Sequence, residues 1–144
     1  MAEVEEKAQR AAVSVQEKKR KLAVVCTNGL ANFLEWTKYI QGYELRIFKV
    51  EALRDIERAI DWADVVWFEW MNEAAIHGTR YRNIVYKDGV IIRCHSYEAL
   101  SGFHKKINWE AVTDLVFVAD HVRDLVKKGL AEPIGQGQIK WDEN

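Results

Sequence analysis

The chain has 144 residues, a formal net charge of −1 at pH 7 and a hydrophobic share of 49%. This length fits one domain, and the composition excludes an intrinsically disordered chain. The near-zero charge gives no indication of a nucleic-acid partner, and no apolar run approaches the roughly 20 residues of a membrane span. Because the only cysteines are Cys26 and Cys94 and no secretory leader is recognisable, we expect a reduced protein of the cytoplasm.

The N-terminal segment is charged and favours a helix. Residues 3–19 are rich in Glu, Lys, Ala and Gln, so we interpret residues 1–20 as a solvated helix or linker. The basic run Lys18–Lys21 is typical of a solvated helix end, although it could also contact an anionic membrane surface. Residues 21–130 form the predicted domain, and residues 131–144, with the single proline Pro133, form a loop or hinge tail.

Short apolar runs alternate with helical patterns along the predicted domain. Strands are expected at residues 22–27, 43–50, 64–70, 90–94 and 115–119. Helices are expected at residues 31–40, 51–63, 72–86, from about 97, and at 120–129, with a short helical turn at 107–114. The sequence NIVYKDGVIIR could instead form a hairpin that turns at Asp88-Gly89, but we favour a helix that Gly89 closes.

This alternation predicts an α/β fold: a doubly wound, Rossmann-like parallel sheet of five strands with an extra N-terminal helix. The usual strand order, 3-2-1-4-5, would place the ends of the first and fourth strands side by side at the topological switch point, where ligands bind. The segments CTNG and CHSYE would then form two halves of one crevice, with Cys26 close to Cys94. Two thiols beside a histidine raise the question of a metal, but their spacing fits no metal motif and we expect none.

Charged side chains near the ends of these strands need partners. Arg93 lies on an apolar strand, where an unpaired charge is costly, so we expect a carboxylate beside it. Glu98, in the first turn of the next helix, is the expected partner, and Asp120 is the next candidate. This pair would support the loop that carries His95, which could itself be a structural histidine.

Several segments resemble, in order, the N-terminal Rossmann-like half of GT-B glycosyltransferases, in particular the large retaining family of sucrose- and mannosyl-type enzymes. They are KLAVVCTNGL…FL, ADVVWFEW, VIIRCHSYE and INWEAVTDLVFVADHVRD, and they cover residues 21–128. The resemblance implies that His95 is catalytic and faces the donor sugar. It also implies that Asn28, Gly29 and Leu30 approach the donor phosphates, although Asn28-Gly29 stands where many members have two glycines.

The expected function is therefore that of an acceptor-side domain of a retaining, nucleotide-sugar-dependent glycosyltransferase. Glu69 could bind an acceptor hydroxyl and Trp70 could stack on a sugar, or both could be ordinary packing residues at the sheet edge. The resemblance implies two partners, a C-terminal Rossmann-like donor domain and a sugar or glycan acceptor, and no cofactor besides the nucleotide-sugar substrate. Without the donor domain the chain should be inactive. The alternative is a Rossmann-like binding or interaction module without catalysis.

Overall fold

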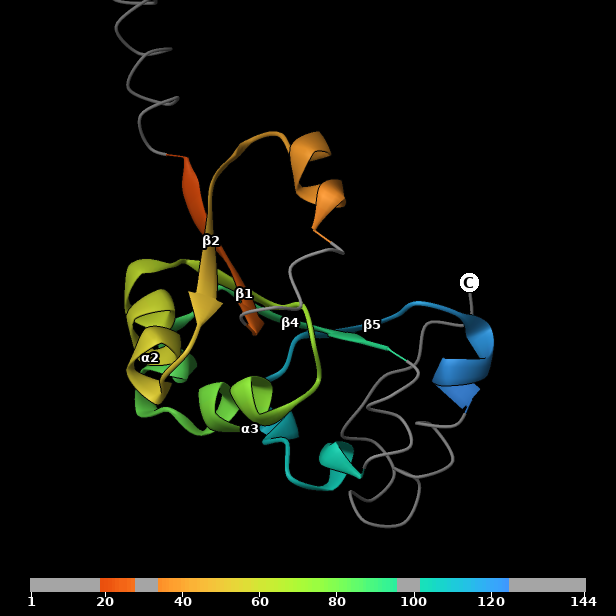
Figure 1. Ribbon diagram of the computed structural model, residues 1–144. Helices are drawn as coiled ribbons and strands as arrows, with labels where there is room; N and C mark the ends of the chain where they lie inside the picture. Colours follow the sequence, from red (N-terminus) through yellow and green to blue (C-terminus); the bar gives the residue numbers. More distant parts are fainter. Residues whose placement is uncertain (1–18, 28–33, 96–101, 125–144) are drawn as a thin grey trace, which may run out of the picture.

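A computed structural model describes residues 19–27, 34–95 and 102–124 of the chain, and these residues form an α/β domain (Figure 1). Five strands make one sheet: β1 (Arg20–Thr27), β2 (Tyr43–Val50), β3 (Val65–Phe68), β4 (Gly89–Cys94) and β5 (Asp114–Phe117). All neighbouring strands run parallel, and β1 pairs with β2 along eight residues in register. The predicted fold class, a five-stranded parallel α/β sheet, is confirmed.

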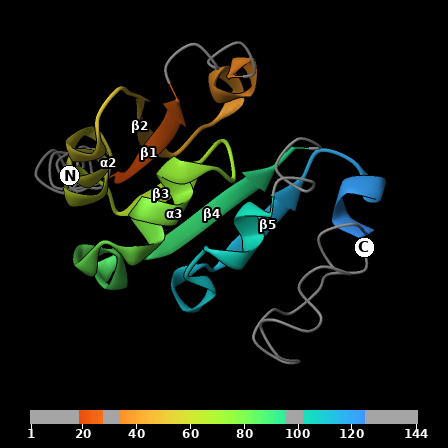
Figure 2. The ribbon, with the colours of Figure 1, turned by 60° about the horizontal axis from the view of Figure 1, so that its bottom comes forward.

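The strands lie in the order β2-β1-β3-β4-β5, which Figure 2 shows side by side. β3 therefore lies between β1 and β4, pairing Leu22 with Val65 on one side and Val65 with Gly89 on the other. The expectation that the first and fourth strands are neighbours, with the third strand at an edge, is wrong in this detail. The topological switch point lies between β1 and β3 in this order.

Two helices, α2 (Leu53–Trp62) and α3 (Glu73–Arg80), contribute to the larger hydrophobic cluster on one face of the sheet. α2 directs Ile56, Ala59 and Ile60 inward at helical spacing, as the sequence pattern predicts. Side chains of alternate strand residues meet them, including Val25, Val66, Phe68, Val90 and Ile92. This cluster holds the two helices firmly on the sheet and so fixes the loops at its carboxyl edge.

The other face of the sheet carries a second, smaller cluster. Its buried members are Leu22, Val24, Cys26, Leu34 and Val65. Three tryptophans, Trp36, Trp67 and Trp70, pack against it as partly buried residues. Trp36 belongs to a short 3₁₀ helix, η2 (Glu35–Tyr39), which stands where the sequence predicts a helix over residues 31–40. The first residues of that predicted helix, and the 28–30 loop before it, lie outside the described residues.

The segment between α3 and β4 differs from its prediction. α3 ends at Arg80, Tyr81 is extended with ψ 130°, and a 3₁₀ helix, η3 (Arg82–Tyr86), follows. Gly89 is the first residue of β4 and does not close a helix, and no hairpin forms because β4 pairs in parallel with β3. The break is anchored by Arg80, whose guanidinium donates two hydrogen bonds, of 3.0 and 2.7 Å, to the Lys106 carbonyl.

Other boundaries agree more closely with the sequence prediction. Two 3₁₀ turns, η4 (Phe103–Lys105) and η5 (Trp109–Ala111), precede β5, and residues 120–124 begin the helix expected after it. Arg20 and Lys21, assigned by sequence to the basic end of the N-terminal helix, belong to β1. The rest of the predicted N-terminal helix, the start of the helix expected from about residue 97, and the tail lie outside the described residues.

Candidate functional site

The carboxyl ends of β3 and β4 bring together four of the predicted site residues, Glu69, Trp70, Arg93 and His95. β1 ends at Thr27, β3 leads directly into Glu69 and Trp70, and β4 leads into His95. Because β3 lies between the other two strands, Glu69 and Trp70 occupy the middle of the sheet and not its edge. The structure thus places them beside His95, a neighbourhood that the expected strand order did not give.

Glu69 is a fully buried carboxylate that accepts hydrogen bonds from three side chains. Its Oε1 accepts from Arg93 Nη1 at 2.7 Å, and its Oε2 accepts from Trp67 Nε1 at 2.8 Å and from Trp36 Nε1 at 3.2 Å. A buried carboxylate is stable only with such partners. Glu69 therefore ties β3, β4 and the η2 segment together, and none of its surface is exposed to a ligand.

This ion pair answers the question of which carboxylate neutralises Arg93. Glu98, the partner expected from the sequence, lies outside the described residues. Asp120, the second candidate, lies 3.8 Å from Arg123. Arg93 and Glu69 stand one residue past the paired ends of neighbouring strands, on the face of the smaller cluster, so their side chains meet directly.

His95 is buried at 8% exposure and is held by a stacked tryptophan. The rings of Trp70 and His95 have centroids 3.8 Å apart and planes inclined by 20°. His95 Nε2 lies 3.8 Å from Glu69 Oε1, close enough for electrostatic attraction but beyond hydrogen-bond distance. One face of Trp70 is therefore used for His95, and Glu69, Trp70, Arg93 and His95 form one connected group, which we call the Glu69 cluster.

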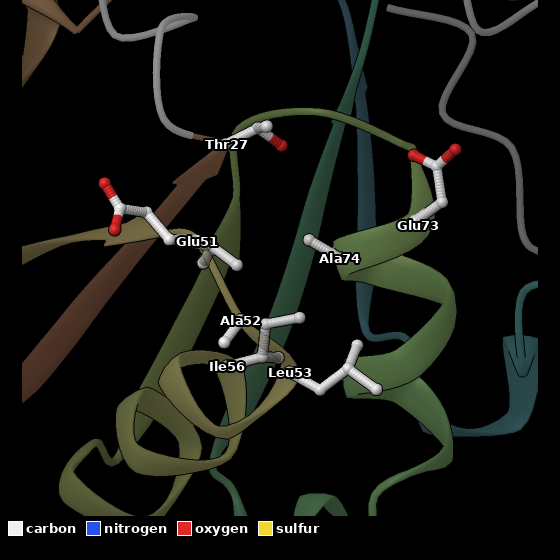
Figure 3. Close-up of a pocket in the computed structure, with 8 residues that line it drawn as sticks. Thr27, Glu51, Ala52, Leu53, Ile56, Glu73 and Ala74 are labelled. Atoms are coloured by element: carbon white, nitrogen blue, oxygen red, sulfur yellow. The ribbon is translucent and has the colours of Figure 1, made fainter.

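A pocket of about 310 Å³ opens on the face of the sheet that α2 and α3 cover, opposite to the face that carries Glu69 and Arg93 (Figure 3). It lies between the loops that lead into α2 and α3, and its walls are mostly apolar. The lining residues are Thr27, Val50, Glu51, Ala52, Leu53, Ile56, Glu73 and Ala74. In Figure 3 the Glu51 carboxylate points away from α3, and the Glu73 carboxylate stands at the start of that helix, above Ala74.

Thr27 ends β1 beside the topological switch point, and it also lines the pocket. Asn72 Nδ2 donates to Thr27 Oγ1 at 2.9 Å, and Asn72 Oδ1 accepts from the Ala74 backbone N–H at 3.1 Å. Asn72 is thus the N-cap of α3 and fixes the hydroxyl of Thr27 at the pocket wall. Sequence reasoning did not identify this pair, although Asn72 before a helical run is a recognisable cap signal.

Side chains accept hydrogen bonds from backbone N–H groups at the starts of both helices. Asp55 Oδ2 accepts hydrogen bonds from the backbone N–H groups of Glu51 and Ala52, each at 3.0 Å. These bonds hold the pKa of the Asp55 carboxyl below its ordinary value. The two carboxylates that line the pocket, Glu51 and Glu73, repel an anion and so favour a neutral, hydroxyl-bearing ligand over a phosphate. The predicted phosphate-binding residues Asn28, Gly29 and Leu30 lie outside the described residues.

The two cysteines do not lie on neighbouring strands. Cys26 belongs to the smaller cluster and Cys94 to the larger one, on opposite faces of the sheet, and β3 separates their strands. The expectation that they lie side by side is therefore wrong. Burial, and secondly the nearby Glu69 carboxylate, raises the pKa of the Cys26 thiol to about 11, so this thiol stays protonated and unreactive at neutral pH.

Among residues 19–27, 34–95 and 102–124, no group of three or more His, Cys, Asp or Glu side chains is placed to hold a metal ion. Within the same part of the chain, every helix is too short or too polar to cross a bilayer. Comparison of the chain with protein-family models, curated proteins and solved structures found no match.

Proposed function

We propose that this chain is the acceptor-side domain of a retaining, nucleotide-sugar-dependent glycosyltransferase. The observation that carries the proposal is the position of His95, which follows β4 at the carboxyl edge of a parallel sheet and stacks on Trp70. Ligands of open α/β sheets bind at this edge. The ordered sequence resemblance gives the same histidine the role of facing the donor sugar.

Within this proposal the predicted site residues have different tasks. His95 is the catalytic residue, which would hold the donor sugar by a hydrogen bond as positive charge develops on it. Glu69 is fully buried and bound by three donors, so it positions Arg93 and His95 and does not touch the acceptor. The acceptor would occupy the pocket beside Thr27, whose apolar walls suit the carbon face of a sugar ring. Because this pocket and His95 lie on opposite faces, the reacting hydroxyl would have to extend over the carboxyl edge of the sheet to meet the donor sugar.

The donor half of the reaction belongs to a second Rossmann-like domain in this proposal. That domain would bind the nucleotide-sugar and stabilise the departing diphosphate, so the 144-residue chain alone should bind acceptors without transferring sugar. We propose a cytoplasmic location, in keeping with the buried cysteines Cys26 and Cys94, neither of which forms a disulfide.

The test measures binding of a panel of mono- and disaccharides to the purified chain by saturation-transfer NMR. We expect at least one saccharide to bind in the millimolar range, and Ala52→Trp, which fills the pocket, to abolish the signal. Val85→Trp is the matched control, because Val85 is 73% exposed and does not line the pocket. If no saccharide binds, or if Ala52→Trp binds like the parent, the acceptor assignment is wrong.

A second measurement concerns the reaction itself. In a protein that joins this chain to a donor domain, His95→Ala should reduce turnover strongly and leave saccharide binding in the pocket unchanged. If His95→Ala and the parent have equal turnover, the role of His95 is structural. Transfer by the 144-residue chain alone would contradict the division of labour between the two domains.

A non-catalytic binding module is the second candidate function. The observation that favours it is the burial of the Glu69 cluster, since Glu69 is 0% and His95 only 8% exposed. Under this alternative the cluster only stabilises the sheet, and the pocket binds a ligand that is not a transfer substrate. His95→Ala would then lower the melting temperature, and no saccharide would be transferred by the joined protein.

A further inference from the structure

β2 forms one end of the sheet and presents a long outer edge. It is eight residues long, and β1 is its only partner among the strands of the described residues (Figure 2). The backbone N–H and C=O groups on the outer edge of an end strand are a template for pairing with another strand. Such an edge is usually short, bulged or covered, whereas β2 is regular along its whole length.

The two faces of β2 differ in chemistry. Tyr43, Leu45 and Ile47 share the face of the smaller cluster, where Leu45 packs and Tyr43 and Ile47 remain 39% and 38% exposed. Glu44 and Arg46 are exposed on the opposite face. The guanidinium of Arg46 lies 4.8 Å from the ring centroid of Phe48, on that same face. The strand therefore offers an apolar stripe on one face and two opposite charges on the other.

We propose that β2 pairs antiparallel with β2 of a second copy of this chain, about a two-fold axis that passes beside Leu45. Antiparallel pairing about an axis perpendicular to the sheet keeps each face on its own side and joins two five-stranded sheets into one. In this register Leu45 faces its own copy, and Tyr43 faces Ile47 of the second copy on the apolar face. On the other face, Glu44 faces Arg46 of the second copy, twice.

The charges select this register over its neighbours. Pairing shifted to place Glu44 at the axis would set two carboxylates opposite each other, and pairing with Arg46 at the axis would set two guanidinium groups together. Like charges directly opposite each other destabilise a strand pair, whereas opposite charges and aromatic–β-branched pairs stabilise it. If one strand slipped by a single residue relative to the other, the apolar residues of the two copies would lie on opposite faces of the joined sheet.

The expected association is weak, because one strand edge buries less than the roughly 1,200 Å² typical of a stable interface. The dimer should therefore form with increasing concentration. Sedimentation velocity of the full chain from 1 μM to 1 mM measures this equilibrium. We expect the weight-average mass to rise toward that of a dimer within this range of concentrations.

Charge exchange tests the register. Glu44→Arg and Arg46→Glu should each weaken the dimer at least tenfold, because each sets like charges opposite each other. The double variant Glu44→Arg/Arg46→Glu should restore dimerisation to within about threefold of the parent, because the charges become complementary again. Glu110→Arg, an equal change of charge at an exposed residue outside β2, is the control and should leave the dimer unchanged.

A thermal melt of each variant shows that the fold is intact. Arg46→Glu could destabilise the domain by losing its ring contacts, so Glu44→Arg carries the test in that case. Hydrogen exchange at low and high concentration gives an independent measure, with added protection expected in Tyr43–Ile47. A chain that remains monomeric to 1 mM, a dimer unaffected by Glu44→Arg, or a folded double variant that stays monomeric would each overturn the proposal.

Discussion

Glu69 shows how much one buried carboxylate does in this domain. Its side chain is 0% exposed, whereas that of Arg93 keeps 26% exposure. Three donors converge on the carboxylate, so its burial is compensated only while they all remain. The sequence predicts that Arg93 has a carboxylate partner, and its ion pair with Glu69 confirms this prediction. Glu98 is the partner expected from the sequence because it falls in the first turn of the next predicted helix, and it lies outside the described residues.

Removing the charge of Glu69 should destabilise the domain strongly. Glu69→Gln removes the counter-charge that Arg93 has among the described residues, and such a loss typically costs about 3–5 kcal/mol. We expect the lower end of this range because Arg93 keeps partial contact with water. Urea unfolding measures the change. The double variant Glu69→Leu/Arg93→Met should recover much of the loss, and an unchanged midpoint for Glu69→Gln alone would show that the pair contributes little.

His104 is a second buried polar residue, and its ring is unsatisfied. It is 6% exposed, and neither ring nitrogen has a hydrogen-bond partner, although its carbonyl accepts from Trp109 Nε1 at 2.8 Å. Burial, and secondly the charge of Lys105, lowers the pKa of His104 below its ordinary value of 6.5. The folded state therefore resists a proton that the unfolded chain accepts.

This difference predicts a loss of stability in acid. Above pH 6.5 the ring is neutral in both states and has no effect on the pH dependence. As the pH falls below 6.5, the unfolded chain is protonated first, so stability decreases until the folded-state pKa is reached. Urea midpoints at pH 7.5 and pH 5 should show a larger decrease for the parent than for His104→Leu. Parallel decreases in the two proteins would mean that other groups cause the effect.

At the scale of elements, the close packing of α3 on the sheet depends on one small residue in the helix. Gly78 lies inside the helix, where glycine costs up to about 1 kcal/mol relative to alanine. The reason is close packing, because a Cβ at this position would clash with Cζ of Phe68 and would lie 2.6 Å from its Cε1. Phe68 is fully buried under the helix, so its ring has little room to move.

Gly78→Ala should therefore destabilise the protein despite the better helix propensity of alanine. Overpacking of a core typically costs about 1–3 kcal/mol, and the gain in propensity offsets part of it. Thermal unfolding should show the decrease. In a Phe68→Leu background the same change should cost much less, since the clashing ring atoms are gone. An equal cost in both backgrounds would place the strain elsewhere.

At the scale of the whole molecule, the sequence predicts the strands well and their neighbours poorly. Apolar runs and their spacing locate five strands and α2, because burial imposes those patterns directly. The expected strand order follows the usual order of doubly wound sheets, although the sequence contains a better indication of which strands lie at the end and which in the interior. YELRIFKV alternates charged and apolar residues, as suits an end strand, whereas VVWF is apolar throughout and suits the interior of the sheet.

The sequence predicts that four of the candidate site residues lie at strand ends, but it does not predict how they are arranged. Placing Glu69, Trp70, Arg93 and His95 at strand ends needs only the strand boundaries, and the structure confirms these positions. Their contacts depend on which strands are neighbours, which no local pattern encodes. The pocket beside Thr27 depends on two loops and two helix ends, so it could not be read from the sequence at all.

The seam between β1 and β3 also has a consequence for how the chain folds. Asp64 closes this seam, because its carboxylate accepts from the Lys21 backbone N–H at 2.9 Å and its own N–H donates to the Lys21 carbonyl at 2.9 Å, across 43 residues of sequence. Every other strand pair joins segments that follow each other along the chain. The pairing of β1 with β3 therefore has the longest sequence separation in the sheet. We expect it to slow folding relative to a sheet built only from consecutive strands, because folding rates fall as contacting residues lie farther apart in sequence.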